Sequence, residues 1–338
     1  MRVFVTGGTG FVGSHIVEAL IRDGHDVRLL ARRPERVEPA LSPLGVGVGG
    51  VVTGDVLDPS AVARAVAGCD AAVHAAAVYS IDPRKTAEVV RTNVRATEIV
   101  LNAAVDAGLG PVVHVSTYGA LLPNDGVLGP DAPVGSGAPP YPRSKAESDR
   151  VARRMQAEGA PVVITYPGAV AGPHDPYLGD TDFAIAMVLR GRIPFAMSGG
   201  WPVADVRYVA DAHARILDHR GGTHRYMLGG HYVTWRQMYA ALRRVTGRRL
   251  PAVPMPYPLA LAGGRLMDGL QRVVRARLPF GSQGAWIVRH CRGYDDARTR
   301  RELKLSPPPL EVTLTDTIRW LVDAGHLPAR SAGRAISE

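Results

Sequence analysis

Residues 6–13 read Thr6-Gly7-Gly8-Thr9-Gly10-Phe11-Val12-Gly13, and this glycine-rich stretch decides the fold. It follows a short β-rich run, Arg2 to Thr6, and it leads into Phe11 to Arg22, where apolar residues recur with the period of a helix. The first glycine permits a tight turn, the second lets the backbone approach a pyrophosphate, and the third lets the helix pack closely on the strand. The chain therefore opens as strand, turn and helix, with the helix N-terminus aimed at phosphate groups.

The following segments keep the alternation of strand and helix. Apolar runs predict further strands at 26–31, 51–56, 71–77, 112–116 and 162–166. Helical spacing predicts helices at 59–66 and 86–107. Because nearly continuous apolar strands are typical of a sheet covered on both faces, we expect an α/β fold with a doubly wound parallel sheet of about seven strands.

The second half of the chain is less regular. We expect residues 1–170 to form a dinucleotide-binding Rossmann domain, with returning segments around 203–220. Residues 171–330 then supply mainly a smaller substrate-binding domain, and residues 331–338 a disordered tail. Further expectations are a strand at 203–208, a helix at 183–189 capped by Asp182, a helix at 212–218 capped by Asp211, and a last helix at 313–324.

Tyr141 and Lys145 are the candidate catalytic pair, in Tyr141-Pro142-Arg143-Ser144-Lys145. In a helix, a spacing of four puts the phenol and the ammonium on one face, where the cation favours the phenolate. An unperturbed tyrosine titrates near ~10, so a tyrosine that moves protons near neutral pH needs this help. The pair therefore predicts a proton donor beside a redox cofactor, against the alternative of a surface tyrosine next to a lysine.

A hydroxyl group is expected at the end of the strand 112–116. Ser116 and Thr117 both lie there, on the same rim of the sheet as the glycine loop. We choose Thr117 over Ser116 as the group that hydrogen-bonds a substrate carbonyl oxygen together with Tyr141.

Arg32 and Arg33 follow the second strand, where an acidic residue would bind the adenosine ribose of NAD. A guanidinium is a planar, permanently charged partner for a 2′-phosphate. NADP is therefore the predicted cofactor and NAD the alternative, in which both arginines begin a solvated loop.

Small and acidic residues are expected beside the cofactor at the ends of other strands. Asp55 is placed to accept the adenine amino group, or else to cap the following helix, and Ala75 to Ala77 lie next to it. His74 and His114 each lie within an apolar strand, and no second histidine, cysteine or acid stands at metal-ligand spacing from them. We interpret both as core residues and expect no metal site.

Taken together, the chain resembles the extended short-chain dehydrogenase/reductases, in the branch of NAD-dependent epimerase/dehydratases and dihydroflavonol reductase-like proteins. The resemblance covers nearly the whole chain, and its motifs are the glycine loop, Gly54-Asp55-Val56-Leu57-Asp58, Ser116-Thr117, Tyr141-x3-Lys145, Tyr166-Pro167-Gly168, Gly172-Pro173 and Tyr294-Asp295-Asp296. It implies that Lys145 also holds the nicotinamide ribose, that Asn93 faces the active-site region, and that the segment after Pro167 lies along the nicotinamide. It also implies a homodimer through the helices containing Asn93 and Tyr141.

The residues expected at the cofactor are Gly7, Thr9, Gly10, Phe11, Val12, Gly13, Arg32, Arg33, Asp55, Val56, Ala75, Ala76, Ala77, Asn93, Ser116, Tyr141, Lys145 and Pro167. The expected substrate contacts, on loops near the predicted cleft, are Tyr79, His174 and Tyr177.

Two departures from the family pattern narrow the expected reaction. Tyr118 and Gly119 stand where dehydratases of this family carry an acid and a base, so dehydration is not expected. Tyr166 stands where an arginine often precedes the proline, and no arginine for a substrate diphosphate is evident. We therefore expect reversible reduction of a ketone or aldehyde. The alternatives are a nucleotide-sugar epimerase with tightly bound NAD, and a dinucleotide-sensing protein without catalysis.

Composition excludes several classes of protein. With 338 residues and two cysteines, the chain suits a two-part cytoplasmic protein rather than a disulfide-rich one, and no signal peptide precedes the first strand. Its net charge of +9 comes from scattered arginines without a nucleic-acid-binding motif. Residues 251–280 lack the ~20 apolar residues of a membrane span and predict an amphipathic helix over the substrate cleft, or alternatively one lying on an anionic lipid surface.

Overall fold

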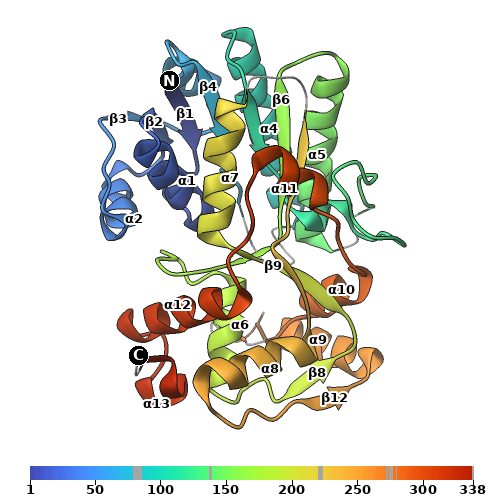
Figure 1. Ribbon diagram of the computed structural model, residues 1–338. Coiled ribbons are helices and arrows are strands. Elements are labelled where there is room, and N and C mark those ends of the chain that lie inside the picture. Colours follow the sequence, from blue (N-terminus) through green and yellow to red (C-terminus); the bar gives the residue numbers. More distant parts are fainter. Residues whose placement is uncertain are drawn as a thin grey trace.

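The structure is a computed structural model that describes residues 1–78, 86–136, 139–219, 224–271, 273, 277–278 and 280–336. Figure 1 shows a layered α/β half that carries the N-terminus, above a smaller half built of helices and short strands. Tyr79 falls outside the described residues.

The layered half is built on a parallel sheet of seven strands in the order β10-β6-β5-β4-β1-β2-β3. The strands are β1 (Arg2–Thr6), β2 (Asp26–Ala31), β3 (Gly50–Thr53), β4 (Ala71–His74), β5 (Val112–Val115), β6 (Val162–Pro167) and β10 (Arg225–Leu228). The strand order reverses between β1 and β4, which is where a doubly wound sheet opens a crevice at its carboxyl edge.

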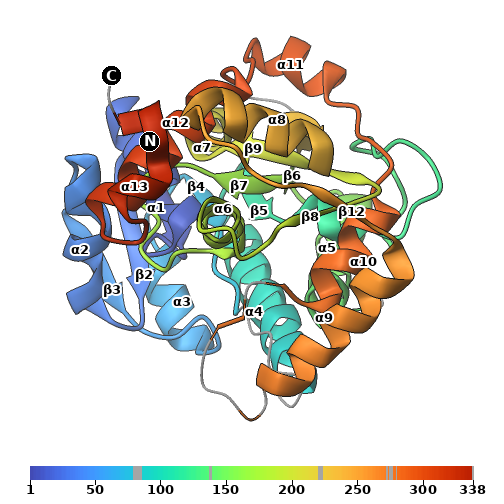
Figure 2. The same cartoon turned by 90° about the horizontal axis from the view of Figure 1, so that it is seen from below.

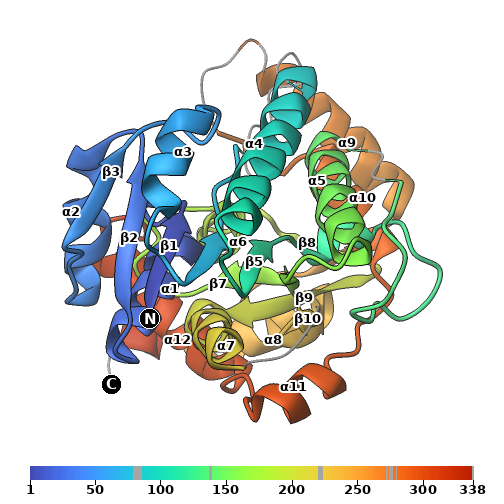
Figure 3. The same cartoon turned by 90° about the horizontal axis from the view of Figure 1, so that it is seen from above.

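Helices cover both faces of this sheet, as predicted (Figure 3). One face carries α3 (Pro59–Val66), α4 (Thr86–Asp106) and α5 (Pro140–Ala157). The other carries α1 (Phe11–Arg22) and α7 (Val206–Asp218), while α2 (Val37–Leu41) lies near the β3 edge and α11 (Ala297–Leu303) near β10. The expected doubly wound α/β fold is confirmed.

The central strand β1 shows why the sheet is covered twice. Val3 and Val5 pack into the core on the α1 and α7 side, whereas Phe4 packs into the core on the α3 and α4 side. All three side chains are fully buried. Side chains of a strand alternate between the two faces of a sheet, so a strand that is apolar at every position must be buried on both faces.

The smaller half contains two short sheets and a separate core. One sheet joins β11 (His231–Thr234), β9 (Gly200–Asp205) and β7 (Ala169–Ala171), and the other joins β12 (Val253–Met255) to β8 (Phe195–Met197). Its helices are α6 (Asp180–Leu189), α8 (Trp235–Thr246), α9 (Tyr257–Gln271), α10 (Ser282–His290), α12 (Leu310–Asp323) and α13 (Ala329–Ala332). Figure 2 shows α9 and α10 side by side at the edge of this half.

Two predicted helix caps are wrong. Helix α7 begins at Val206, so Asp211 lies inside it, and the cap is Asp205, whose carboxylate accepts the Arg207 N–H at 2.8 Å. Helix α6 begins at Asp180 after Gly179, so Asp182 lies in the first turn, where it is buried. Both errors arise because the strand before α7 and the loop before α6 end two or more residues earlier than the apolar pattern indicates.

The predicted disordered tail is also wrong for the residues described there. Helix α13 is followed by a 3₁₀ turn at Gly333–Ile336, and Ala332 and Ala335 are buried. Arg248 donates to the Ser331 carbonyl at 2.7 Å, and Arg319 donates to the Ala335 carbonyl at 2.9 Å. Small side chains and carbonyl contacts dock this segment on the smaller half, although its composition is typical of a tail. Residues 337–338 lie outside the described part.

Helix α9 forms where residues 251–280 predict an amphipathic helix, but the burial of its side chains does not follow that pattern. It buries Ala260 and Gly264, whereas Leu259 and Leu266 are exposed. Among the described residues, no helix has the length and apolar character needed to cross a membrane. Contact of α9 with a lipid surface stays a prediction.

Candidate active site

The glycine turn after β1 is closed so tightly that side chains are excluded from it. Gly7 has a φ of +77°, and a Cβ there would lie 2.6 Å from the Ala75 carbonyl carbon. A Cβ at Gly13 would overlap the Gly7 carbonyl oxygen. Helix α1 then begins after Gly10 without a side-chain cap and without an acidic residue in its first turn. Its first N–H groups and the positive end of its dipole therefore fit an anionic group such as a pyrophosphate.

The two histidines of the adjacent strands are core residues, as predicted. The His74 and His114 rings stack with centroids 5.7 Å apart, and Thr6 Oγ1 lies 2.8 Å from His74 Nδ1. Burial lowers the pKa of His74 to about 3. The described residues contain no group of three or more side chains that could hold a metal ion. Thr6 Oγ1 also accepts the Ala76 N–H at 3.3 Å, which fixes the loop after β4 beside the glycine turn.

The carboxyl ends of β2 and β3 bring Arg32 close to Asp55. Arg32 Nη1 lies 3.7 Å from Asp55 Oδ2, and Arg32 and Arg33 are both exposed. The alternative that Asp55 caps the following helix is wrong, because Asp58 accepts the Ser60 N–H at the start of α3. Asp55 instead accepts the Leu57 N–H at 2.9 Å. Two guanidinium groups and one carboxylate thus lie at the edge where the adenosine end of a dinucleotide would bind.

Tyr141, at the start of α5, is hydrogen-bonded to Thr117. Burial, together with the Asp180 carboxylate, raises the pKa of Tyr141 to about 12, although the Thr117 hydrogen bond acts in the opposite direction. The expected lowering of this pKa by Lys145 is therefore not what the structure shows. The free energy lost when the phenolate is removed from water is larger than the free energy gained from the hydrogen bond.

Lys145 lies one turn further along α5 and is buried. Its Nζ donates to the Val115 carbonyl at 3.0 Å. Burial lowers the pKa of Lys145 to about 8, against the opposing effect of Asp149. The nearby Ser116 hydroxyl acts to lower the pKa of the Asp149 carboxyl group, which burial raises. The structure thus places Thr117, and not Ser116, beside Tyr141.

Asn93 ties α4 to the rim of the sheet. Its Oδ1 accepts the Val78 N–H at 2.7 Å, and its Nδ2 donates to the Val78 carbonyl and to Ser144 Oγ, both at 2.9 Å. The side chain is buried. Asn93 therefore fixes the residue before Lys145 relative to the loop after β4.

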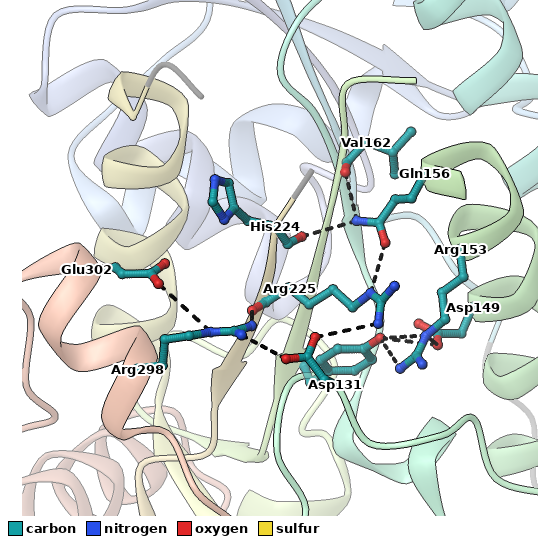
Figure 4. Close-up of polar contacts among 10 residues, drawn as sticks. Asp131, Asp149, Arg153, Gln156, Val162, His224, Arg225, Arg298 and Glu302 are labelled. Atoms are coloured by element: carbon teal, nitrogen blue, oxygen red, sulfur yellow. Dashed lines mark hydrogen bonds and ion pairs between the residues drawn. The ribbon is translucent and has the colours of Figure 1, made fainter. Parts of the chain in front are cut away.

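Tyr166 points away from the rim. Its hydroxyl donates to Asp149 at 3.2 Å and accepts from Arg153 Nη2 at 2.7 Å, so it belongs to a buried network on α5. Figure 4 shows a second, separate group of polar contacts nearby, in which Arg225 donates to Gln156 and Asp131 pairs with Arg225 and Arg298. Asp149, Arg153 and Gln156 all lie on α5, so both groups help to hold the helix that carries Tyr141 and Lys145.

A cavity of about 790 Å³ opens beside Tyr141. Gln283 and Asp180 line it and also interact with Tyr141: Gln283 Oε1 accepts the Tyr141 N–H at 3.3 Å, and Asp180 acts on the pKa of the phenol. Segments from α6, α8, α9 and α10 form its walls. Three of the four tryptophans of the chain line it, namely Trp201, Trp235 and Trp286.

The sequence does not identify these three tryptophans as cavity residues. Tryptophan is rare in the chain and occurs in its second half, which is a usable signal, but the positions do not show which tryptophans meet. His174 and Tyr177, the expected substrate contacts, are not among the lining residues. Tyr177 accepts a hydrogen bond from Arg36 at 3.4 Å. His174 lies close enough to His15 of α1 to lower the pKa of His15. Both lie near residues of the sheet half instead.

A model of the NAD dependent epimerase/dehydratase family matches residues 3–229. The chain belongs to this family. Its relatives are named as reductases, dehydratases and epimerases, so the protein is an NAD(P)-dependent enzyme.

Three similar proteins show how far the likeness extends. Sterol demethylase protein B of Methylococcus capsulatus is 30% identical over 97% of this chain and 100% of its own. A 4-hydroxy-2-methyl-3-oxo-4-farnesyl-3,4-dihydroquinoline-1-oxide ketoreductase of Stigmatella aurantiaca is 29% identical over 96% of this chain and 98% of its own. The crystal structure of a UDP-glucose-4-epimerase from Stenotrophomonas maltophila with bound NAD has a TM-score of 0.75 at 20% identity, covering 96% of this chain and 99% of that one, and shows the same fold.

Proposed function

We propose that this protein reduces a ketone or aldehyde reversibly, with NADP as its preferred cofactor. The observation that carries the proposal is the hydrogen bond between Thr117 and Tyr141 beside a large cavity, with Lys145 one turn away on the same helix. The similarity over nearly full length to a protein named as a ketoreductase supports the same reaction.

The raised pKa of Tyr141 suits the reducing direction. At pH 7 the phenol is protonated, so it can donate its proton to a carbonyl oxygen as charge develops there. Thr117 adds a second hydrogen bond to that oxygen. Lys145, whose pKa lies near 8, keeps a positive charge behind the phenol while the proton leaves. When bound, the nicotinamide supplies the hydride to the carbonyl carbon.

The glycine turn and the N-terminus of α1 would hold the pyrophosphate, and Lys145 would hold the nicotinamide ribose. Arg32 and Arg33 would meet a 2′-phosphate, because both guanidinium groups are exposed at the carboxyl end of β2. Asp55, Val56, Ala75 to Ala77 and Pro167 line the same edge of the sheet. A tightly NAD-bound nucleotide-sugar epimerase is the second candidate, since it would use the same triad in both half-reactions.

Replacing Tyr141 by phenylalanine tests the reaction. With a panel of carbonyl substrates followed by NADPH absorbance, we expect Tyr141→Phe to lower kcat by about 10²- to 10⁴-fold, because the proton donor is lost. Tyr257→Phe, at a tyrosine of α9 rather than of α5, is the matched control and should keep its activity. An unchanged rate in Tyr141→Phe would refute the mechanism.

Michaelis constants for NADPH and NADH test the cofactor. We expect a lower KM for NADPH, and a rise in that constant when Arg32 and Arg33 are both changed to serine, because a charged partner of the 2′-phosphate is removed. Equal or better use of NADH by the unaltered protein would defeat the assignment of NADP. Purification with NAD bound and activity on a UDP-sugar would favour the epimerase.

A further inference from the structure

The cavity beside Tyr141 has predominantly apolar walls. Its buried lining includes Ile193 and Leu242, exposed by 1% and 0%, from the core of the smaller half. Other large apolar side chains in the lining include Phe183, Trp201, Trp235, Leu278, Phe280 and Trp286. A wall of this kind binds ligands through the apolar area that they remove from water.

Positive and negative side chains are equal in number among the described residues of the lining, and some of them are paired. The positive ones are Arg265 and Arg277, and the negative ones are Asp180 and Asp268. Arg277 is paired with Asp180, donates to the Leu178 carbonyl and lies 4.2 Å from the centre of the Phe183 ring. A substrate diphosphate would need an excess of positive charge in the cavity, and the described lining does not provide one.

We propose that the carbonyl compound reduced at this site has a large apolar body, such as a long hydrocarbon chain or a fused-ring skeleton, with its carbonyl group at Tyr141. This inference rests on the proposed function and names its substrate class. About 790 Å³ is near the upper end of the range of roughly 300–1,000 Å³ that small-molecule sites span, so the space exceeds the needs of a small ketone. Trp201, Trp235 and Trp286 would contact the apolar body.

A homologous series of methyl ketones tests the inference directly. From 2-butanone to 2-dodecanone, we expect kcat/KM with NADPH to rise by about two- to fourfold for each added methylene, because each one leaves water for an apolar wall. A flat series, or a preference for the shortest ketone, would overturn the proposed substrate class while leaving carbonyl reduction intact.

Gly284 is exposed at the open side of the cavity and offers a way to narrow it without disturbing the fold. It lies in α10 and lines the cavity, and a Cβ at this position meets nothing within 4 Å. We expect Gly284→Trp to reduce kcat/KM for 2-dodecanone at least tenfold, with a smaller effect on 2-butanone. Gly263→Trp is the matched control, because Gly263 is also helical with an open Cβ direction but does not line the cavity. Equal effects of both variants on both ketones would contradict the inference.

A binding measurement separates this inference from the proposed reaction. In the Tyr141→Phe variant, 2-dodecanone should change the tryptophan fluorescence with a saturable dependence on its concentration, and UDP-glucose should not. Binding of 2-dodecanone by a protein that reduces no ketone would support the apolar site and defeat the proposed function. A fluorescence change with UDP-glucose alone would defeat the apolar site.

Discussion

Burial displaces the pKa values of Tyr141 and Lys145 in opposite directions, to about 12 and about 8. In each case the neutral form is favoured, because the charged form has lost its hydration. The two shifts move the pKa values of the phenol and the ammonium apart, from 10.0 and 10.5 to about 12 and about 8. The phenol therefore keeps its proton until a carbonyl oxygen that develops negative charge takes it, while the amine supplies the compensating charge.

Lys145 should make the protein less stable at neutral pH than an apolar residue would. Its pKa is lower in the folded state, so between pH 8 and 10.5 the unfolded chain binds the extra proton and the free energy of unfolding rises with pH. We expect Lys145→Met to gain about 1–3 kcal/mol at pH 7, and this gain to shrink as pH rises through that window. Urea unfolding at several pH values measures it. Lys304→Met, at an exposed lysine, should change little, and a loss of stability in Lys145→Met at pH 7 would contradict the prediction.

Asn93 should matter for both stability and rate. Asn93→Leu leaves the Val78 N–H and carbonyl and the Ser144 hydroxyl without this partner, so we expect a loss of about 1–3 kcal/mol in unfolding free energy. Because Ser144 adjoins Lys145, kcat should fall as well. Asn102→Leu, at an exposed position on the same helix, should stay within about 0.5 kcal/mol. Leucine favours a helix more than asparagine does, so helix propensity cannot cause a loss in either variant, and comparable losses in both would contradict the role of the Asn93 hydrogen bonds.

Among the elements, α1 could be predicted to the residue, whereas α7 could not. The glycine turn and the apolar period fix Phe11 and Arg22 as the ends of α1. For α7, the residues Val206 to Tyr208 resemble a continuation of the strand before them. The helix begins there because Asp205 accepts from Arg207 and from Thr313, more than one hundred residues away. A cap that depends on such a distant contact leaves no local signal.

Asp205 and Asp211 form a matched pair for testing this cap. We expect Asp205→Ala to lower the free energy of unfolding by about 1–3 kcal/mol, because a buried cap and the partner of Arg207 are lost. Asp211→Ala removes an ion pair with Arg22 near the surface and should cost less than about 1 kcal/mol. The pKa of Asp205 is lowered in the folded state. The stability that the Asp205 carboxylate contributes is therefore present above pH ~4 and is lost as the pH falls through the pKa of the folded state. Chemical denaturation at pH 7 and in acid measures both effects, and equal costs at pH 7 would contradict the assignment.

At the scale of the whole molecule, the sheet was predictable and the cavity was not. The sheet follows from local apolar runs and one glycine turn. The cavity is assembled from α6, α8, α9 and α10, which are separated by up to about a hundred residues of chain, so its lining depends on how the smaller half packs. The sequence places Thr117, Tyr141 and Lys145 near one another because they lie on or next to elements of the sheet half. It does not place Tyr177, because the loop that carries this residue reaches Arg36 in the sheet half rather than the cavity.

We expect the protein to be a homodimer in which α4 and α5 pair with their copies. The two helices pack together on one face of the sheet, as Figure 3 shows. Sedimentation velocity at micromolar concentration should give twice the mass of the chain, 36.0 kDa. A monomer under these conditions would contradict the expectation.

The loop from Gly172 to Gly179 touches both places where ligands are expected. Tyr177 meets Arg36 on the dinucleotide side, and the loop leads directly into Asp180 at the cavity. Tyr177 is 54% exposed, and the loop contains no lysine or arginine. Chymotrypsin therefore has a cleavage site there that trypsin lacks, and the rate at which it nicks the chain would give a footprint of either ligand without any assay of turnover.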